Sequence, residues 1–113
     1  MIDYLNTVAE IAEERKKYFQ RYKYYAKLIK DTVDLADVEV VVFGSVLEKE
    51  HTMASDIDVL IVSDDVPKGL DERAKILSKI NKVLGYFHPF ELHLVSKKES
   101  EWYKRLIKNY LKV

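Results

Sequence analysis

Two short groups of residues in this sequence have the types and spacing to bind phosphate and a metal ion. The first is Gly44-Ser45, a predicted tight turn that follows the apolar run at 38–43. Backbone N–H groups and a hydroxyl at such a turn can meet phosphate oxygens, most effectively where a helix begins. The second group is Asp56 and Asp58. Ten residues separate Ser45 from Asp56. Residues two apart on a strand point to the same face, so both carboxylates are expected to share Mg²⁺.

A third carboxylate, Glu91, is predicted to join the two aspartates. It lies with His93 on one side of the alternating segment 90–95, opposite the apolar side chains. An inward carboxylate is unfavourable without a counter-charge, which a metal ion would provide. Three convergent carboxylates beside a phosphate-binding turn predict a two-metal site, with one Mg²⁺ activating an attacking hydroxyl and the other steadying a triphosphate. The implied reaction is nucleotidyl transfer, with Glu91 as a metal ligand, a general base or both.

Plainer structural roles stay open for the same residues. Acidic residues at the entrance of a strand can belong to a solvated turn, and Glu91 can be a surface acid on an edge strand. His93 can border the site or be a structural histidine. Ser55 and Thr52 either stabilise the loop before the aspartates or contact phosphate. We therefore take Ser55, together with Gly44-Ser45, as a candidate for nucleotide binding.

The surrounding pattern predicts an α/β fold in which a small mixed sheet is flanked by helices. Apolar residues recur every three or four positions in the helical segments, whereas the strand segments are β-branched or alternate. Gly85 is well placed to end a helix. The expected elements are a long amphipathic helix over 3–30, strands over 38–43, 57–63 and 90–95, helices over 71–84 and 97–112, and a short helix over 46–50.

Composition limits the class of protein. With 113 residues, 48% of them apolar, the chain suits a single domain over 1–113 with one core. The absence of cysteine excludes disulfides and thiolate zinc sites and favours a cytoplasmic location. No apolar run approaches the ~18 residues of a membrane span, so we expect a soluble protein with no membrane partner.

Charge is unevenly distributed although the net charge is zero. Residues 31–66 carry ten acidic residues and one lysine, whereas the segments on either side are basic. Lys-rich solvated helices are one explanation of this pattern. An acidic metal site between basic surfaces is the other.

The order of these motifs resembles the minimal nucleotidyltransferases of the DNA polymerase β superfamily. The resemblance rests on Gly44-Ser45, the ten-residue spacing, Asp56 and Asp58 with apolar strand residues around them, and Glu91 on a later strand. It covers roughly residues 38–96, the expected catalytic core. It implies the polymerase β-like fold, a nucleoside triphosphate at the Gly-Ser turn, and two magnesium ions bound by the three acids.

The same resemblance suggests a partner. Small members of the family commonly pair with a helical protein of the HEPN type, as antitoxin and toxin, and are understood to adenylylate a tyrosine on it. Since this chain is too short for a separate substrate domain, we expect AMP transfer from ATP to a hydroxyl on such a partner. Many relatives follow Gly-Ser with a basic residue, whereas this chain has Val46, with Lys49 as a substitute. Two alternatives therefore stay open: an inactive nucleotide-binding antitoxin that acts by contact, and a stand-alone enzyme for a small molecule.

Tyrosines alternate with basic residues in the second half of the first helix. Such a pattern could stack nucleic-acid bases. Helical spacing instead predicts that most of these rings are core or interface residues, and we do not expect nucleic acid as the physiological ligand. Tyr24 lies off the apolar stripe, which predicts an exposed contact with another subunit, a second copy of this chain among them.

Overall fold

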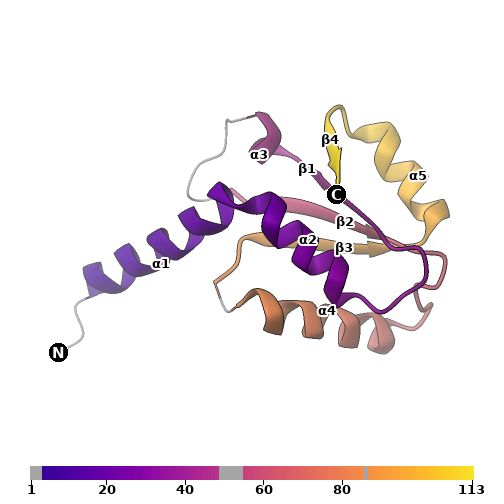
Figure 1. Ribbon diagram of the computed structural model, residues 1–113, viewed down its shortest axis with the longest axis horizontal. Coiled ribbons are helices and arrows are strands. Elements are labelled where there is room, and N and C mark those ends of the chain that lie inside the picture. The colour runs from indigo at the N-terminus through magenta and orange to yellow at the C-terminus, as the bar shows by residue number, and fades with distance from the viewer. Residues whose placement is uncertain (1–3, 49–54, 86) are drawn as a thin grey trace.

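The computed structural model describes residues 4–48, 55–85 and 87–113, which form a four-stranded sheet flanked by helices (Figure 1). The helices are α1 (Tyr4–Gln20), α2 (Tyr22–Thr32), α3 (Ser45–Glu48), α4 (Leu70–Leu84) and α5 (Lys97–Leu106). The strands are β1 (Glu39–Phe43), β2 (Ile57–Val62), β3 (Phe90–Val95) and β4 (Tyr110–Lys112). The predicted α/β fold with a mixed sheet is confirmed. Within these described residues, none of the helices has the length and apolar character to cross a membrane.

The strands lie in the order β3-β2-β1-β4. β1 runs antiparallel to both of its neighbours, β2 and β4. β2 and β3 are parallel, with Ile57 opposite Phe90 and Val62 opposite Val95. A parallel pair needs a crossover connection, and α4 supplies it. This crossover is what places β3 directly beside the strand that carries Asp58.

One face of the sheet holds the main core. On β2 this face carries Ile57, Val59 and Ile61, all fully buried. α2 and α4 cover it (Figure 1), and Ile29 of α2 and Ile80 of α4 are also fully buried within the same cluster. Full burial of an aliphatic side chain of this size contributes about 1.5–3 kcal/mol. This layer therefore supplies most of the apolar stabilisation of the fold.

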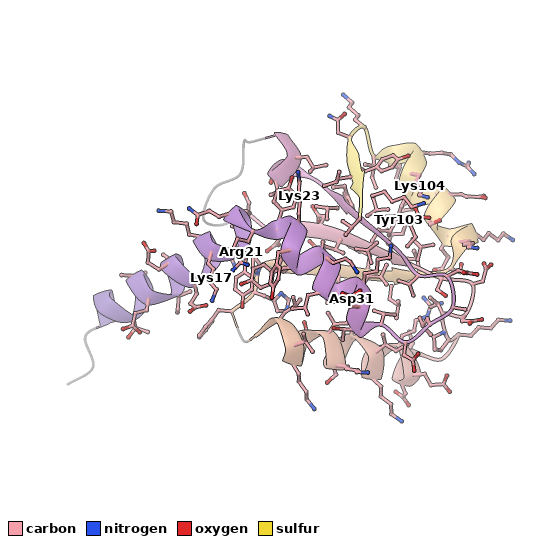
Figure 2. All side chains as sticks on the ribbon, in the orientation of Figure 1. Lys17, Arg21, Lys23, Asp31, Tyr103 and Lys104 are labelled. Carbon is pink, nitrogen blue, oxygen red and sulfur yellow. The ribbon has the colours of Figure 1, made fainter. Side chains whose placement is uncertain are left out.

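The opposite face of the sheet is divided between a packed end and an open end. α5 lies over the packed end, where its Tyr103 contacts a small cluster that includes Leu60 and Val62 (Figure 2). Alternate residues of β2 share this face, so Asp58 projects from it at the other end. The Asp58 side chain keeps 27% of its surface exposed. Asp58 is thus accessible to solvent, next to the apolar cluster that packs under α5.

The single helix predicted over 3–30 is instead two helices that bend at Arg21. Arg21 has φ −120° and ψ 33°, outside helical values, although its N–H and carbonyl keep their helical hydrogen bonds. No glycine or proline marks the bend in the sequence, which is why helical spacing did not predict it. The bend lets the rings of Tyr18 and Tyr25 both pack beside Phe90, with centroids 5.9 and 6.1 Å away. Beyond it, α1 projects from the body of the protein (Figure 1).

The helix predicted over 97–112 is wrong beyond Leu106, because the last residues form β4. This strand pairs with β1, and the Val113 N–H donates to the Val40 carbonyl at 2.8 Å. Without β4, that edge of β1 would present unpaired backbone groups, so sheet pairing overrides the local helical spacing.

The other elements begin and end within one or two residues of the predicted bounds. α4 ends at Gly85 as expected, with φ 104°. α3 begins one residue before the predicted short helix, and the end of that prediction lies outside the described residues.

Candidate metal and phosphate site

Strand register places four side chains in one row across the open end of the sheet. Phe43 of β1 pairs with Asp58 of β2 and with Tyr110 of β4, and Asp58 pairs with Glu91 of β3. Directly opposed residues share a face, so two aromatic rings and two carboxylates project on the same side. Neighbouring strands lie about 4.8 Å apart, which puts the row within reach of one bound molecule.

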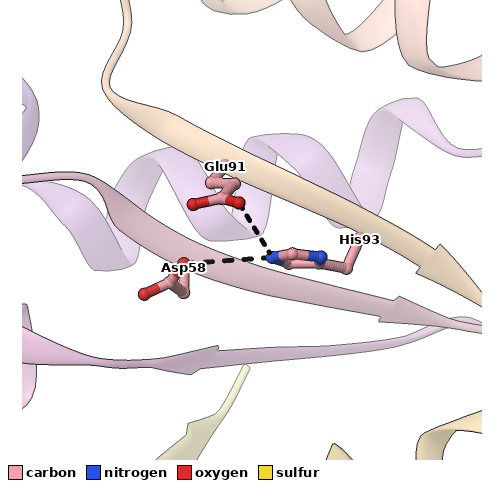
Figure 3. A group of neighbouring side chains, drawn as sticks. All are labelled: Asp58, Glu91 and His93. Carbon is pink, nitrogen blue, oxygen red and sulfur yellow. Dashed lines mark ion pairs between the residues drawn. The ribbon is translucent and has the colours of Figure 1, made fainter.

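Asp58, Glu91 and His93 form a compact cluster in this region (Figure 3). His93 Nε2 lies 3.9 Å from Asp58 Oδ1 and 3.8 Å from Glu91 Oε1. One potential ligand atom from each residue lies within 4.8 Å of the other two. The Glu91 side chain is 53% exposed, more than twice the 24% of His93. The cluster is therefore backed by the sheet and open to solvent on the Glu91 side.

The pKa of Asp58 is raised from its ordinary value to about 6. Partial burial of the carboxylate is the main cause, followed by the negative charge and hydrogen bonding of Glu91. Asp56 makes the smallest contribution in the same direction, whereas the charge of His93 opposes the shift. A bound cation favours ionised carboxylates and would reverse this balance. The electrostatics of the cluster therefore favour a positively charged ligand.

Gly44 holds the predicted phosphate-binding turn directly against Asp58. Its φ of 92° lies in the left-handed region, which glycine adopts without strain. A Cβ atom at this position would overlap Asp58 Oδ2. Ser45 follows as the first residue of α3, and the Leu47 N–H donates to the Gly44 carbonyl at 3.2 Å. The turn and the carboxylate are thus neighbours, as phosphate and metal binding at one site require.

Asp56 lies next to this cluster but outside it. β2 begins at Ile57, so the strand geometry that would align Asp56 with Asp58 does not extend that far. The Asp56 side chain is 57% exposed, and Arg15 Nη2 lies 4.0 Å from its carboxylate. Arg15 also donates to the Ser55 carbonyl at 2.7 Å. The structure brings Asp58 and Glu91 together, whereas α1 positions Ser55 and Asp56 through Arg15.

Sequence reasoning left His93 between two roles and did not single out Arg15. The signal for His93 is parity, because it lies two residues beyond Glu91 on the same face of β3. The signal for Arg15 is a cation on the apolar stripe of α1, between Ile11 and Phe19, where a charged side chain needs a partner. Lys49 and Thr52, both considered from the sequence, lie outside the described residues.

The donor atoms of the cluster fit one divalent cation. Carboxylate oxygens suit Mg²⁺ and Mn²⁺, and imidazole nitrogen suits transition metals. Small side-chain rotations would bring atoms that already lie within 4.8 Å of one another onto a common ion. The raised pKa of Asp58 also agrees with a cation site, because the charge of His93 offsets burial and the negative charge of Glu91 only in part.

The mixed sheet and its flanking helices define an α/β domain, with the glycine turn beside the Asp58–Glu91 pair. The chain belongs to the nucleotidyltransferase domain family, whose sequence model matches residues 25–112. This match begins within α2, so α1 lies outside the part shared with the family model. Nucleotidyl transfer is therefore supported as the general class of reaction, and members of this family typically use divalent metals.

Two solved structures extend the comparison. A crystal structure of a candidate nucleotidyltransferase is 35% identical to this chain, with a TM-score of 0.61, covering 81% of this chain and 96% of that one. A second candidate nucleotidyltransferase, from Sulfolobus solfataricus, is 18% identical, with a TM-score of 0.54, covering 90% of this chain and 84% of that one. The second shows a shared fold only. No protein of curated function matches the sequence.

Proposed function

We propose that the protein transfers AMP from ATP to a hydroxyl group on a partner protein, using Mg²⁺ or a related divalent cation. The observation that carries this proposal is the Asp58–Glu91 pair on two parallel strands, directly beside the Gly44 turn. A glycine turn suited to phosphate, two carboxylates suited to a cation and an open face occur at one place. In the reaction, the hydroxyl oxygen bonds to the α-phosphorus and pyrophosphate leaves.

The residues of the chain would divide this work. Backbone N–H groups and the hydroxyl at Gly44-Ser45 would bind the triphosphate. Asp58 and Glu91 would hold the cation, which when bound offsets phosphate charge and lowers the pKa of the attacking hydroxyl. Glu91, the more exposed of the two, would accept the hydroxyl proton. A second ion, expected from the family resemblance, would need Asp56 and phosphate oxygens as ligands.

The surface beside the cluster favours a protein acceptor. Trp102 and Leu106 of α5 are 59% and 66% exposed, and Tyr110 of the cross-strand row is 49% exposed. Tyr103 connects Trp102 to the site, because its ring centroid lies 5.1 Å from that of Trp102 and 5.6 Å from that of His93. Exposed aromatic and aliphatic side chains of this kind mark protein interfaces. A partner that covers them would bring its own hydroxyl to the carboxylates, and we propose a helical HEPN-type toxin in this role.

The second candidate function is neutralisation of the partner by contact, without transfer. The residue after the Gly-Ser turn is Val46, which is buried in the main core. The turn is therefore not followed directly by a cation that could stabilise charge on the triphosphate, and such groups accelerate phosphoryl-type transfer. A stand-alone enzyme for a small molecule is a third possibility, which the exposed apolar surface disfavours.

Label transfer separates these functions. The protein is incubated with Mg²⁺, ATP labelled at the α-phosphate, and the helical protein encoded by a neighbouring gene. Transfer predicts label on that protein, lost in Asp58→Asn and retained in Asp31→Asn. Asp31 is a matched control because it pairs with Lys27 on the exposed side of α2 (Figure 2). If neutralisation of the partner survives Asp58→Asn with no label in any sample, contact alone is the function. Label on a small molecule instead would contradict the protein acceptor.

A further inference from the structure

We propose that His93 is a direct ligand of the divalent cation and that this nitrogen ligand makes the site select Mn²⁺ or a similar transition metal over Mg²⁺. The inference rests on the proposed function, because it concerns the same cation. It goes beyond that function by adding a residue to the carboxylate pair and by naming the chemical class of the metal.

The position of the imidazole is the first argument. His93 Nε2 points between the two carboxylates (Figure 3), 3.9 Å from Asp58 Oδ1 and 3.8 Å from Glu91 Oε1. Both distances are too long for a hydrogen bond, whose donor and acceptor lie about 2.7–3.2 Å apart. They are the separations expected of atoms that surround a shared ion, since metal–ligand bonds of about 2.0–2.2 Å leave neighbouring ligands roughly 3–4 Å apart.

The support behind His93 is the second argument. Its ring lies beside Phe43 of β1, with centroids 6.0 Å apart, and beside Tyr103 of α5, with centroids 5.6 Å apart. His93 is 24% exposed, so these rings cover much of its surface. A ligand held by neighbouring side chains loses little conformational freedom on binding, which raises the affinity of a metal site. The structure therefore orients Nε2 towards the cluster before any metal arrives.

The donor set determines the selectivity. Mg²⁺ prefers oxygen ligands in a near-ideal octahedron and gives up its waters reluctantly. Imidazole nitrogen instead binds first-row transition metals well. A site with one nitrogen and two carboxylates should hold Mn²⁺ at least about tenfold more tightly than Mg²⁺, with the imidazole supplying most of the difference.

Electron paramagnetic resonance with Mn²⁺ as the probe tests the ligand directly. Mn²⁺ is titrated into the full chain to measure affinity from the loss of the free-ion signal, and pulsed measurements then detect nitrogen bound to Mn²⁺. We expect nitrogen coupling in the wild-type protein and in His88→Gln, and its loss in His93→Gln. His88 is a matched control because its Nε2 lies 2.6 Å from Asn81 Oδ1, outside the cluster. In His93→Gln, Mn²⁺ affinity should fall about tenfold and Mg²⁺ affinity less than about threefold.

The outcomes distinguish this inference from the proposed function. Bound Mn²⁺ without nitrogen coupling in the wild-type protein would overturn the role of His93 and leave the carboxylate site intact. Coupling that persists in His93→Gln would overturn it equally. Failure of Mn²⁺ and of Mg²⁺ to bind, with or without ATP, would count against the metal site itself. Even if His93→Gln does not fold, the wild-type measurement can still overturn the role of His93, by showing bound Mn²⁺ without nitrogen coupling.

Discussion

Glu39 and Asp58 project from the same face of the sheet, one at each end, and their carboxylates meet opposite surroundings. Glu39 Oε1 accepts a hydrogen bond from Lys104 Nζ at 2.8 Å, and Lys112 Nζ lies 3.8 Å from its other oxygen. These two lysines hold the pKa of Glu39 below its ordinary value. Asp58 faces Glu91 instead, and burial and like charge raise its pKa to about 6.

The difference separates an end whose charges are neutralised within the chain from an end that, in our proposal, binds a cation. At the covered end, which is the end packed under α5, α5 and β4 each supply a lysine to one carboxylate. The charge is therefore neutralised within the chain (Figure 2). At the open end, two carboxylates share a small space and a histidine stands between them. An uncompensated pair weakens the free protein and stabilises a complex with a cation. Substitutions at the open end should therefore weaken binding of metal and ATP, whereas substitutions at the other end should lower the free energy of unfolding.

The largest effect is expected from Asp58→Asn. Removing one of the two carboxylates beside the Gly44 turn should lower metal-dependent ATP binding and transfer by about 100-fold or more. The fold should remain, because the substitution also removes the repulsion with Glu91. Isothermal titration with Mn²⁺ and ATP, alongside thermal unfolding, measures both quantities. If the affinity for ATP were unchanged, the open end of the sheet would not be the nucleotide-binding site.

Glu91→Gln should have the next largest effect and should separate two roles. If Glu91 accepts the hydroxyl proton, turnover should fall about 10²-fold or more, while the affinity for metal and ATP falls much less. If Glu91 acts only as a ligand, turnover and affinity should fall together. Steady-state kinetics and titration of the same preparation distinguish the two outcomes. If neither turnover nor affinity changed, Glu91 would have no part in the site, and Asp58 would act without it.

Gly44→Ala should damage the open end through the backbone. A φ of 92° strains any residue other than glycine, and the added methyl group would overlap Asp58 Oδ2. We expect a loss of about 1–3 kcal/mol in the free energy of unfolding, together with weaker metal binding. Gly69→Ala is the control, because Gly69 has φ −73° and a Cβ there would meet only Glu72, at 3.9 Å. Urea denaturation of both variants measures the contrast, and equal losses would remove the special role of Gly44.

Most of the fold was predictable because its elements follow local rules. The apolar runs of β1 and β2, the alternation in β3, and the stop at Gly85 all match the observed elements. The bend at Arg21 and the strand β4 were not predictable, since each depends on tertiary contacts. Rings from both sides of the bend pack beside Phe90, and β4 completes an edge that only the assembled sheet presents.

The candidate site was predictable in part for a similar reason. Strand parity places Glu91 on the face that Asp58 shares, and the register of the parallel strands makes them direct neighbours. Asp56 precedes β2 by one residue and lies near Arg15, so its part in the site stays a prediction. Parity also places His93 on the face of Glu91, whereas its support by the rings of Phe43 and Tyr103 comes from two other elements, which a single segment of sequence does not reveal.

The dependence of stability on pH should differ between the two ends. Because the pKa of Asp58 is raised in the folded protein to about 6, its favourable contribution is complete below the unfolded pKa and is lost as pH rises through about 6. A shift of this size corresponds to less than about 3 kcal/mol, and partial exposure reduces it to about 1–2 kcal/mol. Metal-free Asp58→Asn should therefore gain stability relative to wild type between about pH 4 and 7. A constant difference across that range would contradict the raised pKa.

The smallest effect, with the opposite sign, is expected from Glu39→Gln. Because lysines lower the pKa of Glu39, its contribution is present above the unfolded pKa and disappears as pH falls through the folded value. Loss of the partly buried pair should lower the free energy of unfolding near neutral pH by about 0.5–1.5 kcal/mol. Asp31→Asn, in an exposed pair with Lys27, should change it by less than about 0.5 kcal/mol.

A double-mutant cycle of Glu39→Gln with Lys104→Met, followed by urea denaturation, isolates the coupling at the covered end. Metal and ATP binding should stay at the wild-type level in all these variants, because Glu39 lies on the far side of the packed cluster from Asp58. Coupling near zero would mean that the lysines do not stabilise the covered end. A loss of metal binding in Glu39→Gln would mean that the two ends act as one electrostatic unit, since a distant charge would then control the affinity of the open end.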